Sequence, residues 1–212
     1  MDFENRGDVT TLWQDLSPQK ADCELKNFNN NSESGWQEDG LLFDGVDDYV
    51  LCDEINPEYI TLIITAEIKG FETADSRYVA GNWESGGYGI RFNESNIFAD
   101  IYIQGNSDYS VSSPLSYNFN TKYFIAMSYD GSTLKLSSND NSTVFNDVSG
   151  VIKASQLETH FVIGANPKGE DLNYNSNNTG ELVNHNPANI KVYSVLIYGR
   201  ALSDDEINSI KS

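Results

Sequence analysis

The chain has 212 residues and a formal net charge of −19 at pH 7, with only 13 lysine and arginine residues. Binding to nucleic acid or to an anionic membrane surface requires clustered basic side chains, so the composition argues against both partners. Hydrophobic residues make up 39% of the chain, which is enough to build a core, and we find no run of about 18 apolar residues that would predict membrane insertion.

The composition favours a single all-β domain that spans residues 1–212. Glycine, asparagine, serine and tyrosine are frequent, and they suit strands and turns better than helices. There is no internal repeat and no linker. Short apolar or alternating segments separated by turn residues predict strands over residues 12–16, 23–28, 41–43, 49–51, 60–68, 77–82, 88–93, 96–103, 109–113, 122–130, 133–138, 161–165 and 190–198.

Several of these segments carry additional information. Residues 60–68 alternate strictly, with one apolar face and one mixed face. Residues 190–198 are apolar on both faces, so we expect a central strand that is covered on both sides. Asp44-Gly45 between two apolar segments is a hairpin signal, because glycine adopts positive φ at no steric cost.

A short helix is predicted at the C-terminal end. Ser203 and Glu206, three residues apart, form a capping box, and Asp204 and Asp205 occupy the first turn, where the helix dipole favours negative charge. The sequence therefore predicts an all-β, two-sheet antiparallel jelly-roll sandwich with a short C-terminal helix.

The two cysteines, Cys23 and Cys52, both lie at predicted strands. They form either one disulfide or two buried free thiols, and the sequence leaves both open. No cysteine or histidine spacing fits a zinc site.

Separate segments, in order along the chain, resemble laminin-G-like domains of the concanavalin A-like lectin and glucanase superfamily, of the bacterial or phage surface type. They cover roughly residues 12–210. The matching segments are Trp-x-Asp-Leu-Ser at 13–17, Phe-Asp-Gly-Val-Asp-Asp-Tyr-Val at 43–50, Tyr-Asp-Gly-Ser-Thr-Leu-Lys-Leu at 129–136, Ile-Gly-Ala-Asn at 163–166 and Ile-Tyr-x-Arg-Ala-Leu-Ser-x-x-Glu-Ile at 197–207.

The resemblance implies a recognition module of a bacterial surface protein or a phage tail or virion protein, located outside the cell. Its partners would be a glycan or a cell-surface protein, together with the neighbouring domains of a parent chain. The acidic first residues, 1–4, lack the basic start and apolar middle of a signal peptide, and we expect a domain excised from a larger protein.

The turn at Asp44, Gly45, Asp47 and Asp48 is a candidate site for a structural Ca²⁺, which prefers carboxylate and carbonyl oxygens. Relatives also use an acid on the last long strand, near residues 193–194, where this chain has Tyr-Ser. The alternative is that these aspartates only cap the turn through hydrogen bonds to nearby N–H groups.

A glycine-rich stretch offers the mixture of groups that binds sugars, with aromatic faces for the ring and polar groups for the hydroxyls. The candidate ligand-binding residues are Asn82, Trp83, Glu84, Tyr88, Arg91 and Tyr102. Asn106, Asp108 and Tyr109 are expected nearby, and the long polar segment 168–186 is a second candidate region. The alternative for Trp83 and Tyr88 is that they cover the end of the sandwich.

The sequence argues against an enzyme. Glycoside hydrolases need two carboxylates on one strand face, but the strands carry single acids, Glu67 and Asp100. His160 and His185 lack the sequence context of a nucleophilic site. We therefore expect a non-catalytic module that binds a carbohydrate or a surface protein. The alternatives are an assembly module without a ligand pocket and, with less support, a degenerate glycoside hydrolase.

Overall fold

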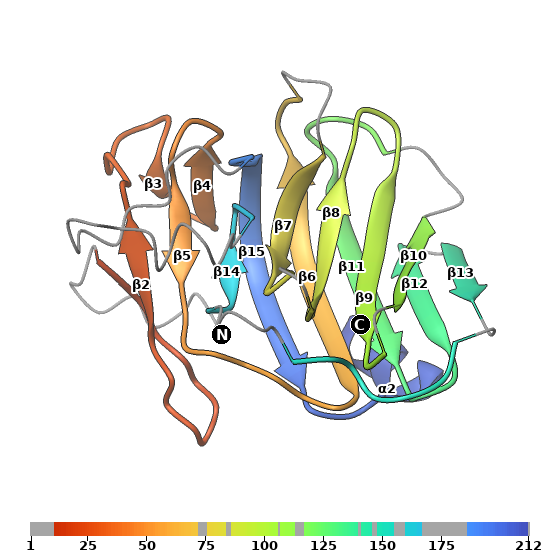
Figure 1. Ribbon diagram of the computed structural model, residues 1–212. Helices are drawn as coiled ribbons and strands as arrows, with labels where there is room; N and C mark the ends of the chain where they lie inside the picture. The colour runs from red at the N-terminus through yellow and green to blue at the C-terminus, as the bar shows by residue number, and fades with distance from the viewer. Residues whose placement is uncertain are drawn as a thin grey trace.

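The computed structural model describes residues 11–71, 76–83, 86–105, 107–112, 117–139, 141–145, 148–154, 160–166 and 186–211. Within these residues two antiparallel sheets lie face to face, and a short helix packs at one end (Figure 1). The predicted all-β, two-sheet antiparallel sandwich with a short C-terminal helix is confirmed.

The first sheet has eight strands. Their order is β1 (Leu12–Trp13), β2 (Cys23–Lys26), β5 (Tyr49–Leu51), β14 (Val162–Ile163), β7 (Arg77–Gly81), β8 (Tyr88–Phe92), β9 (Ile97–Ile103) and β10 (Ser107–Ser112). The second sheet has seven strands. Their order is β13 (Asn141–Phe145), β12 (Leu134–Ser138), β11 (Lys122–Tyr129), β6 (Ile60–Ile68), β15 (Asn189–Tyr198), β4 (Leu41–Asp44) and β3 (Gly35–Trp36).

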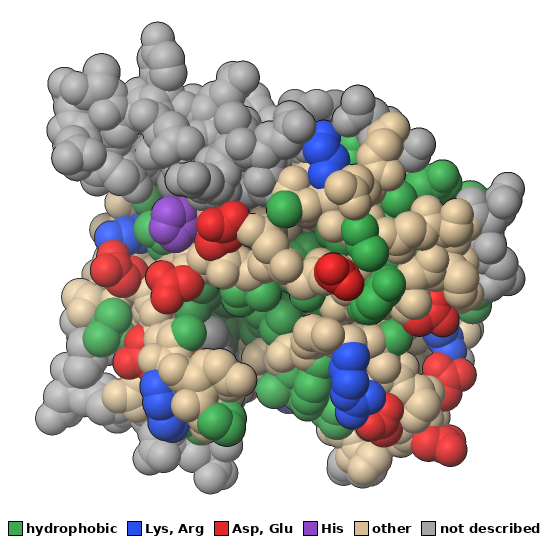
Figure 2. Space-filling model, turned by 60° about the horizontal axis from the view of Figure 1, so that its bottom comes forward, with side chains coloured by type: hydrophobic (Ala, Val, Ile, Leu, Met, Phe, Trp, Pro, Cys, Tyr) green, Lys and Arg blue, Asp and Glu red, His purple; other side chains and the backbone are tan. Residues whose placement is uncertain are grey.

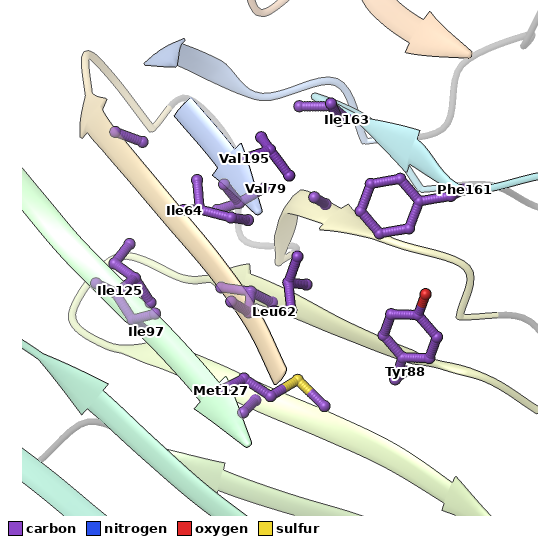
Figure 3. Packing of buried hydrophobic residues seen from close by; sticks show 14 of the residues in the cluster. Leu62, Ile64, Val79, Tyr88, Ile97, Ile125, Met127, Phe161, Ile163 and Val195 are labelled. Carbon is purple, nitrogen blue, oxygen red and sulfur yellow. The ribbon is translucent and has the colours of Figure 1, made fainter. Parts of the chain in front are cut away.

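The core lies between the two sheets, where the inward side chains of the alternating strands meet (Figure 3). Leu62 and Ile64 of β6 and Ile125 and Met127 of β11 come from the seven-stranded sheet and are fully or almost fully buried. Burial of an apolar side chain of this size contributes roughly 1.5–3 kcal/mol. The period-two pattern of the sequence therefore predicts the core because alternate residues of a strand point to one face.

Helix α2 (Asp204–Lys211) covers part of the outer face of the seven-stranded sheet, where Ile63 and Ala126 pack against Leu202 and Ile207. The predicted capping box is present: the Ser203 N–H donates to Glu206 at 2.8 Å, and the Glu206 N–H donates to the Ser203 hydroxyl at 3.3 Å. The helix thus starts where its cap satisfies two backbone donors.

Strand β15 is central, as predicted, and its second half is covered on both sides: Val195 and Ile197 face the core, and Leu196 and Tyr198 pack against the cluster at the helix. The first half is covered on one side only. Its burial alternates, and Lys191 and Ser194 are only half-buried. Strand β6 is also covered on both faces, since it contributes Leu62 to the core and Ile63 to the contact with the helix. The prediction of a strand covered on both sides therefore holds for residues 195–198 and not for residues 189–194.

The Asp44–Asp48 turn is not a hairpin. Strand β4 belongs to the seven-stranded sheet and β5 to the eight-stranded sheet, so the turn carries the chain from one sheet to the other. Both flanking strands were predicted, but the hairpin signal was misleading because a turn motif specifies local backbone geometry and not the sheet that the next strand joins.

The structure joins Cys23 and Cys52 in a disulfide, which decides between the two possibilities that the sequence left open. The bond links β2 to the residue that follows β5. The short strands β3 and β13 were not predicted. β3 has only two residues, and β13 is a largely exposed edge strand whose sequence lacks an apolar face.

Candidate groove on the eight-stranded sheet

A groove of about 420 Å³ lies on the outer face of the eight-stranded sheet. Strand β9 shows how it forms: Ile97, Ala99 and Ile101 point into the core, so Phe98, Asp100 and Tyr102 face outward by alternation. The lining residues come from strands β7 to β10 and from nearby loops. They are Ser76, Tyr78, Trp83, Arg91, Asp100, Asp108, Tyr109, Ser110, Asn166 and Asn186.

An ion pair holds the centre of the groove together. Arg91 of β8 donates from Nε to Asp100 Oδ2 at 2.6 Å and from Nη2 to Asp100 Oδ1 at 3.3 Å. Nη1 donates to the Ser76 hydroxyl at 2.8 Å, and Nη2 also donates to the Ser110 hydroxyl at 3.4 Å. The guanidinium also lies 4.2 Å from the ring centroid of Phe98, its cross-strand neighbour. Four hydrogen bonds and the Phe98 ring therefore fix the position of the partly exposed Arg91 side chain.

Asp100 is almost completely buried, with a relative exposure of 2%. Burial raises the pKa of this carboxyl, while the Arg91 guanidinium acts in the opposite direction. A buried carboxylate of this kind requires its partner, because an unpaired charge in a low-dielectric environment is strongly unfavourable.

Two glycines lie in the strands beside the groove. Gly81 of β7 and Gly89 of β8 lie opposite each other in the register of the two strands. A Cβ atom on Gly89 would meet the Ala80 carbonyl oxygen at 3.2 Å and the Tyr78 ring at 3.6 Å. A larger side chain at Gly89 would therefore crowd the neighbouring strand and fill the space beside Tyr78.

An aromatic pair forms one side of the site. The ring centroids of Trp83 and Tyr102 are 5.6 Å apart, with an angle of 51° between the ring planes. Both side chains are half-buried, so part of each ring remains accessible. The Lys153 ammonium lies 5.0 Å from the Tyr102 ring centroid, which is within cation–π distance.

The groove brings together three of the predicted ligand-binding residues: Trp83 and Arg91 line it, and Tyr102 contacts Trp83. Asp108 and Tyr109 line it as well. Glu84, Asn106, His185 and the segment 168–185 lie outside the described residues. Sequence reasoning missed Ser76 and Ser110 and treated Asp100 only as a lone strand acid. The outward alternation of Phe98, Asp100 and Tyr102 was the signal that identifies this face.

Asn82 and Tyr88 do not face the groove, which corrects their prediction as ligand-binding residues. Both are completely buried. The Asn82 amide donates to the Ile55 carbonyl at 2.9 Å and accepts from the Tyr88 N–H at 3.1 Å. Tyr88 lies in the core (Figure 3), its hydroxyl donates to the Ile55 carbonyl at 3.1 Å, and burial raises the pKa of its hydroxyl. These two residues hold the β7–β8 connection against residues 55–56.

The predicted metal residues also come together. Asp44, Asp47 and Asp48 each place a carboxylate oxygen within 4.8 Å of the others. Asp48 has no exposed surface; its Oδ2 accepts the Asp44 N–H at 2.9 Å, while its Oδ1 has no hydrogen-bond partner. Burial raises the pKa of Asp48 to about 7, against the opposing effect of hydrogen bonds from the Asp44 N–H and the Ser34 side chain. The charges of Asp44 and Asp47 raise it further.

Both interpretations of the turn have support from its geometry. The Val46 N–H donates to Asp44 Oδ1 at 2.8 Å, which is the capping bond of an Asx turn. The unpaired Oδ1 of Asp48 fits a cation, because a buried carboxylate oxygen without a donor is otherwise unfavourable. On the last strand, Tyr193 supplies no carboxylate; its hydroxyl donates to Glu67 at 2.7 Å.

The strand acids do not form a pair. Asp100 is held by Arg91, and Glu67 is held by Lys69 at 3.1 Å and by Tyr193. Hydrogen bonds from Tyr193 and Lys69 hold the pKa of Glu67 below its ordinary value despite its partial burial. A glycosidase needs one carboxyl with a raised pKa beside a second carboxylate. The pKa of Glu67 is lowered, and Asp100, whose pKa is raised, is held in an ion pair with Arg91.

A second hollow, of about 530 Å³, opens at the end of the sandwich that carries the β1–β2 connection (Figure 2). Figure 2 shows hydrophobic side chains on its walls. The Cys23–Cys52 disulfide, Ile55 and Val195 to Tyr198 line it, with Asp53 and Glu54 at the polar side. This hollow contains none of the predicted site residues. Within the described residues, no helix is long and apolar enough to cross a membrane.

No protein-family model matches the chain, and no curated protein matches it by sequence. Among solved structures it is similar to Trypanosoma rangeli sialidase in complex with sialic acid, at 16% identity and a TM-score of 0.64, over 99% of this chain and 31% of the sialidase. It is also similar to the binding domain of Paraclostridial Mosquitocidal Protein 1, at 14% identity and a TM-score of 0.65, over 95% of this chain and 51% of that one.

A third similar structure is the binding domain of botulinum neurotoxin serotype D, at 15% identity and a TM-score of 0.64, over 93% of this chain and 48% of that domain. The chain thus spans about half the length of the toxin binding domains and less than a third of the sialidase. At these identities the similarity concerns the fold, and it identifies the chain as a two-sheet β-sandwich of the architecture found in these proteins.

Proposed function

We propose that this chain is a non-catalytic recognition module of the laminin-G-like type, which binds carbohydrate in the groove beside Arg91 and Asp100. One observation carries the proposal: half-buried aromatic rings lie next to a rigid frame of charged and hydroxyl groups on one sheet face. Sugars bind to such sites because an aromatic ring packs on the apolar face of the pyranose while polar groups bond its hydroxyls.

Two further facts support a binding role over catalysis. The strand acids Glu67 and Asp100 are each held by a cation and do not form a pair. Two of the similar structures are binding domains of toxins. We place the module outside the cell, in a bacterial surface protein or a phage tail or virion protein, where it presents the groove to a glycan-bearing partner.

The experiment is a glycan array followed by titration calorimetry on the glycans that bind. We expect Trp83→Ala to weaken binding by ten- to a hundredfold, because stacking on an aromatic ring contributes about 1–3 kcal/mol in comparable base-stacking sites. Phe119→Ala is the matched control, since Phe119 is an exposed aromatic residue that does not line the groove. A blank array together with self-association in light scattering would favour the assembly module instead.

The proposal includes a structural Ca²⁺ at Asp44, Gly45, Asp47 and Asp48. The unpaired Oδ1 of buried Asp48 supports it, and so does the close approach of the three carboxylates. Such an ion would brace the turn that passes between the two sheets. Its chemistry would be structural, through neutralisation of the three carboxylates.

A further inference from the structure

We infer that the groove selects uncharged, hydroxyl-rich glycans and discriminates against sugars that carry a carboxylate or a sulfate. The inference rests on the proposed function and adds the ligand class to it. The fold alone does not suggest a preference for uncharged sugars, since one of the similar structures is a sialidase in complex with sialic acid, which carries a carboxylate.

Among the described residues, Arg91 is the one arginine that lines the groove. A receptor for an anionic sugar needs a cation with free donors, and arginine is the usual choice because its planar fork matches a carboxylate. Here that fork is already occupied by Asp100, through two hydrogen bonds at 2.6 and 3.3 Å. The Ser76 and Ser110 hydroxyls accept two of the other three guanidinium N–H groups. Arg91 therefore acts as a support for the groove and leaves no fork for a second carboxylate.

Two acids, Asp100 and Asp108, line the groove. Asp108 is exposed in the groove, and no hydrogen bond or ion pair holds its carboxylate among the described residues. Asp108 and Asp100 line the same groove from the adjacent strands β10 and β9, and the charge of Asp108 adds to the effect of burial in raising the pKa of Asp100. The charged residues of the described lining are Arg91, Asp100 and Asp108, so its formal net charge is −1. A ligand carboxylate entering the groove would meet this like charge at short range.

Two neighbouring cations, Arg77 and Lys153, contact side chains of the site without lining the groove. Arg77 donates to the Asn186 side chain at 3.1 Å, and the Lys153 ammonium lies over the Tyr102 ring. The net charge of −19 adds a repulsive field that acts on any approaching anion before contact. The hydroxyls of Ser76 and Ser110 and the carboxylate of Asp108, by contrast, are groups that bond sugar hydroxyls well.

The test compares matched glycans that differ only in charge. Lactose and N-acetyllactosamine oligosaccharides are printed beside their sialylated and sulfated forms, and the affinities of the wild-type chain are measured at low and at physiological salt. We expect the neutral members to bind at least tenfold more tightly than their anionic partners, with a smaller ratio at high salt.

Asp108→Asn is the diagnostic variant, because it removes the unpaired groove charge without touching the Arg91–Asp100 pair. It should reduce the discrimination against anionic glycans several-fold. Asp205→Asn is its matched control: it makes the same charge change on exposed residue 205 of α2, far along the chain from the groove strands, and should change the ratio by less than twofold.

The outcomes separate the two proposals. If no glycan binds, neutral or anionic, the proposed carbohydrate function is overturned. If anionic glycans bind as tightly as the neutral ones, carbohydrate binding stands and the inferred selectivity is wrong. If Asp108→Asn and Asp205→Asn change the ratio equally, the discrimination comes from the overall charge, and its assignment to the groove is overturned.

Discussion

Two aspartates of this sandwich are buried, which disfavours their charged form, but the groups around them differ. Asp100 lies under the groove of the eight-stranded sheet, and Asp48 lies in the turn between the sheets; burial raises the pKa of both carboxyls. Asp100 has a bidentate arginine as its partner, whereas Asp48 has only uncharged donors and one oxygen without a partner. A buried acid with an internal cation stabilises a surface for recognition, and one without it becomes a candidate ligand for a cation from solution.

The largest expected effect comes from breaking the paired site. Arg91→Ala leaves Asp100 buried without its cation and should lower the free energy of unfolding by about 3–5 kcal/mol, measured by urea denaturation. The double variant Arg91→Met with Asp100→Leu should recover most of that loss, because it removes both charges and keeps apolar volume. A double variant as unstable as Arg91→Ala would show that packing by Arg91, and not the ion pair, is the important interaction.

The contribution of Asp48 to the stability of the protein should depend on pH. The folded pKa of Asp48 is about 7, above the ordinary value of 3.8, so its contribution to stability is fully present below about pH 4 and is lost as pH rises through 7. In EDTA, wild type should lose up to about 4 kcal/mol relative to Asp48→Asn between pH 4 and pH 8, because each pH unit between the two pKa values corresponds to about 1.4 kcal/mol. Parallel melting-temperature curves for the two proteins would contradict this expectation.

Calcium should reverse that loss at neutral pH. With a dissociation constant near 1 mM, typical of extracellular modules, 10 mM Ca²⁺ should add about 1.4 kcal/mol to the stability of EDTA-stripped wild type. Asp48→Asn should abolish the response, while Asp108→Asn, an acid of the other region, should keep it. Absence of heat in titration calorimetry and of any melting shift would leave the aspartates as turn caps only.

The smallest effect on stability is expected for a substitution of Asp108, the exposed acid of the groove. Asp108→Asn should change the free energy of unfolding by less than about 0.5 kcal/mol, because an exposed side chain without a partner contributes little to stability. Its influence should appear in glycan selectivity alone. A substantial change in the denaturation midpoint would mean that Asp108 helps to hold the Arg91–Asp100 pair.

The strands were largely predictable because their alternation is a local property. Residues 60–68 were predicted as a strand with the bounds that β6 has, and the capping box at Ser203 correctly marked the start of α2. Asn82 and Tyr88 could not be assigned correctly from the sequence. Both belong to residue types that bind sugars, and only the position of the Ile55 carbonyl shows that their polar groups bond inside the protein.

Periodicity, caps and composition were enough to predict most strands in their order along the chain, the terminal helix and the excess of negative charge. Three-dimensional packing was needed to establish which strands share a sheet, the pairing of Cys23 with Cys52, and the contrast between the two buried aspartates. The physical reason is that a carboxylate's behaviour depends on its burial and its nearest donors. Asp100 meets the Arg91 guanidinium across adjacent strands, whereas Asp48 meets only uncharged donors in and beside its own turn.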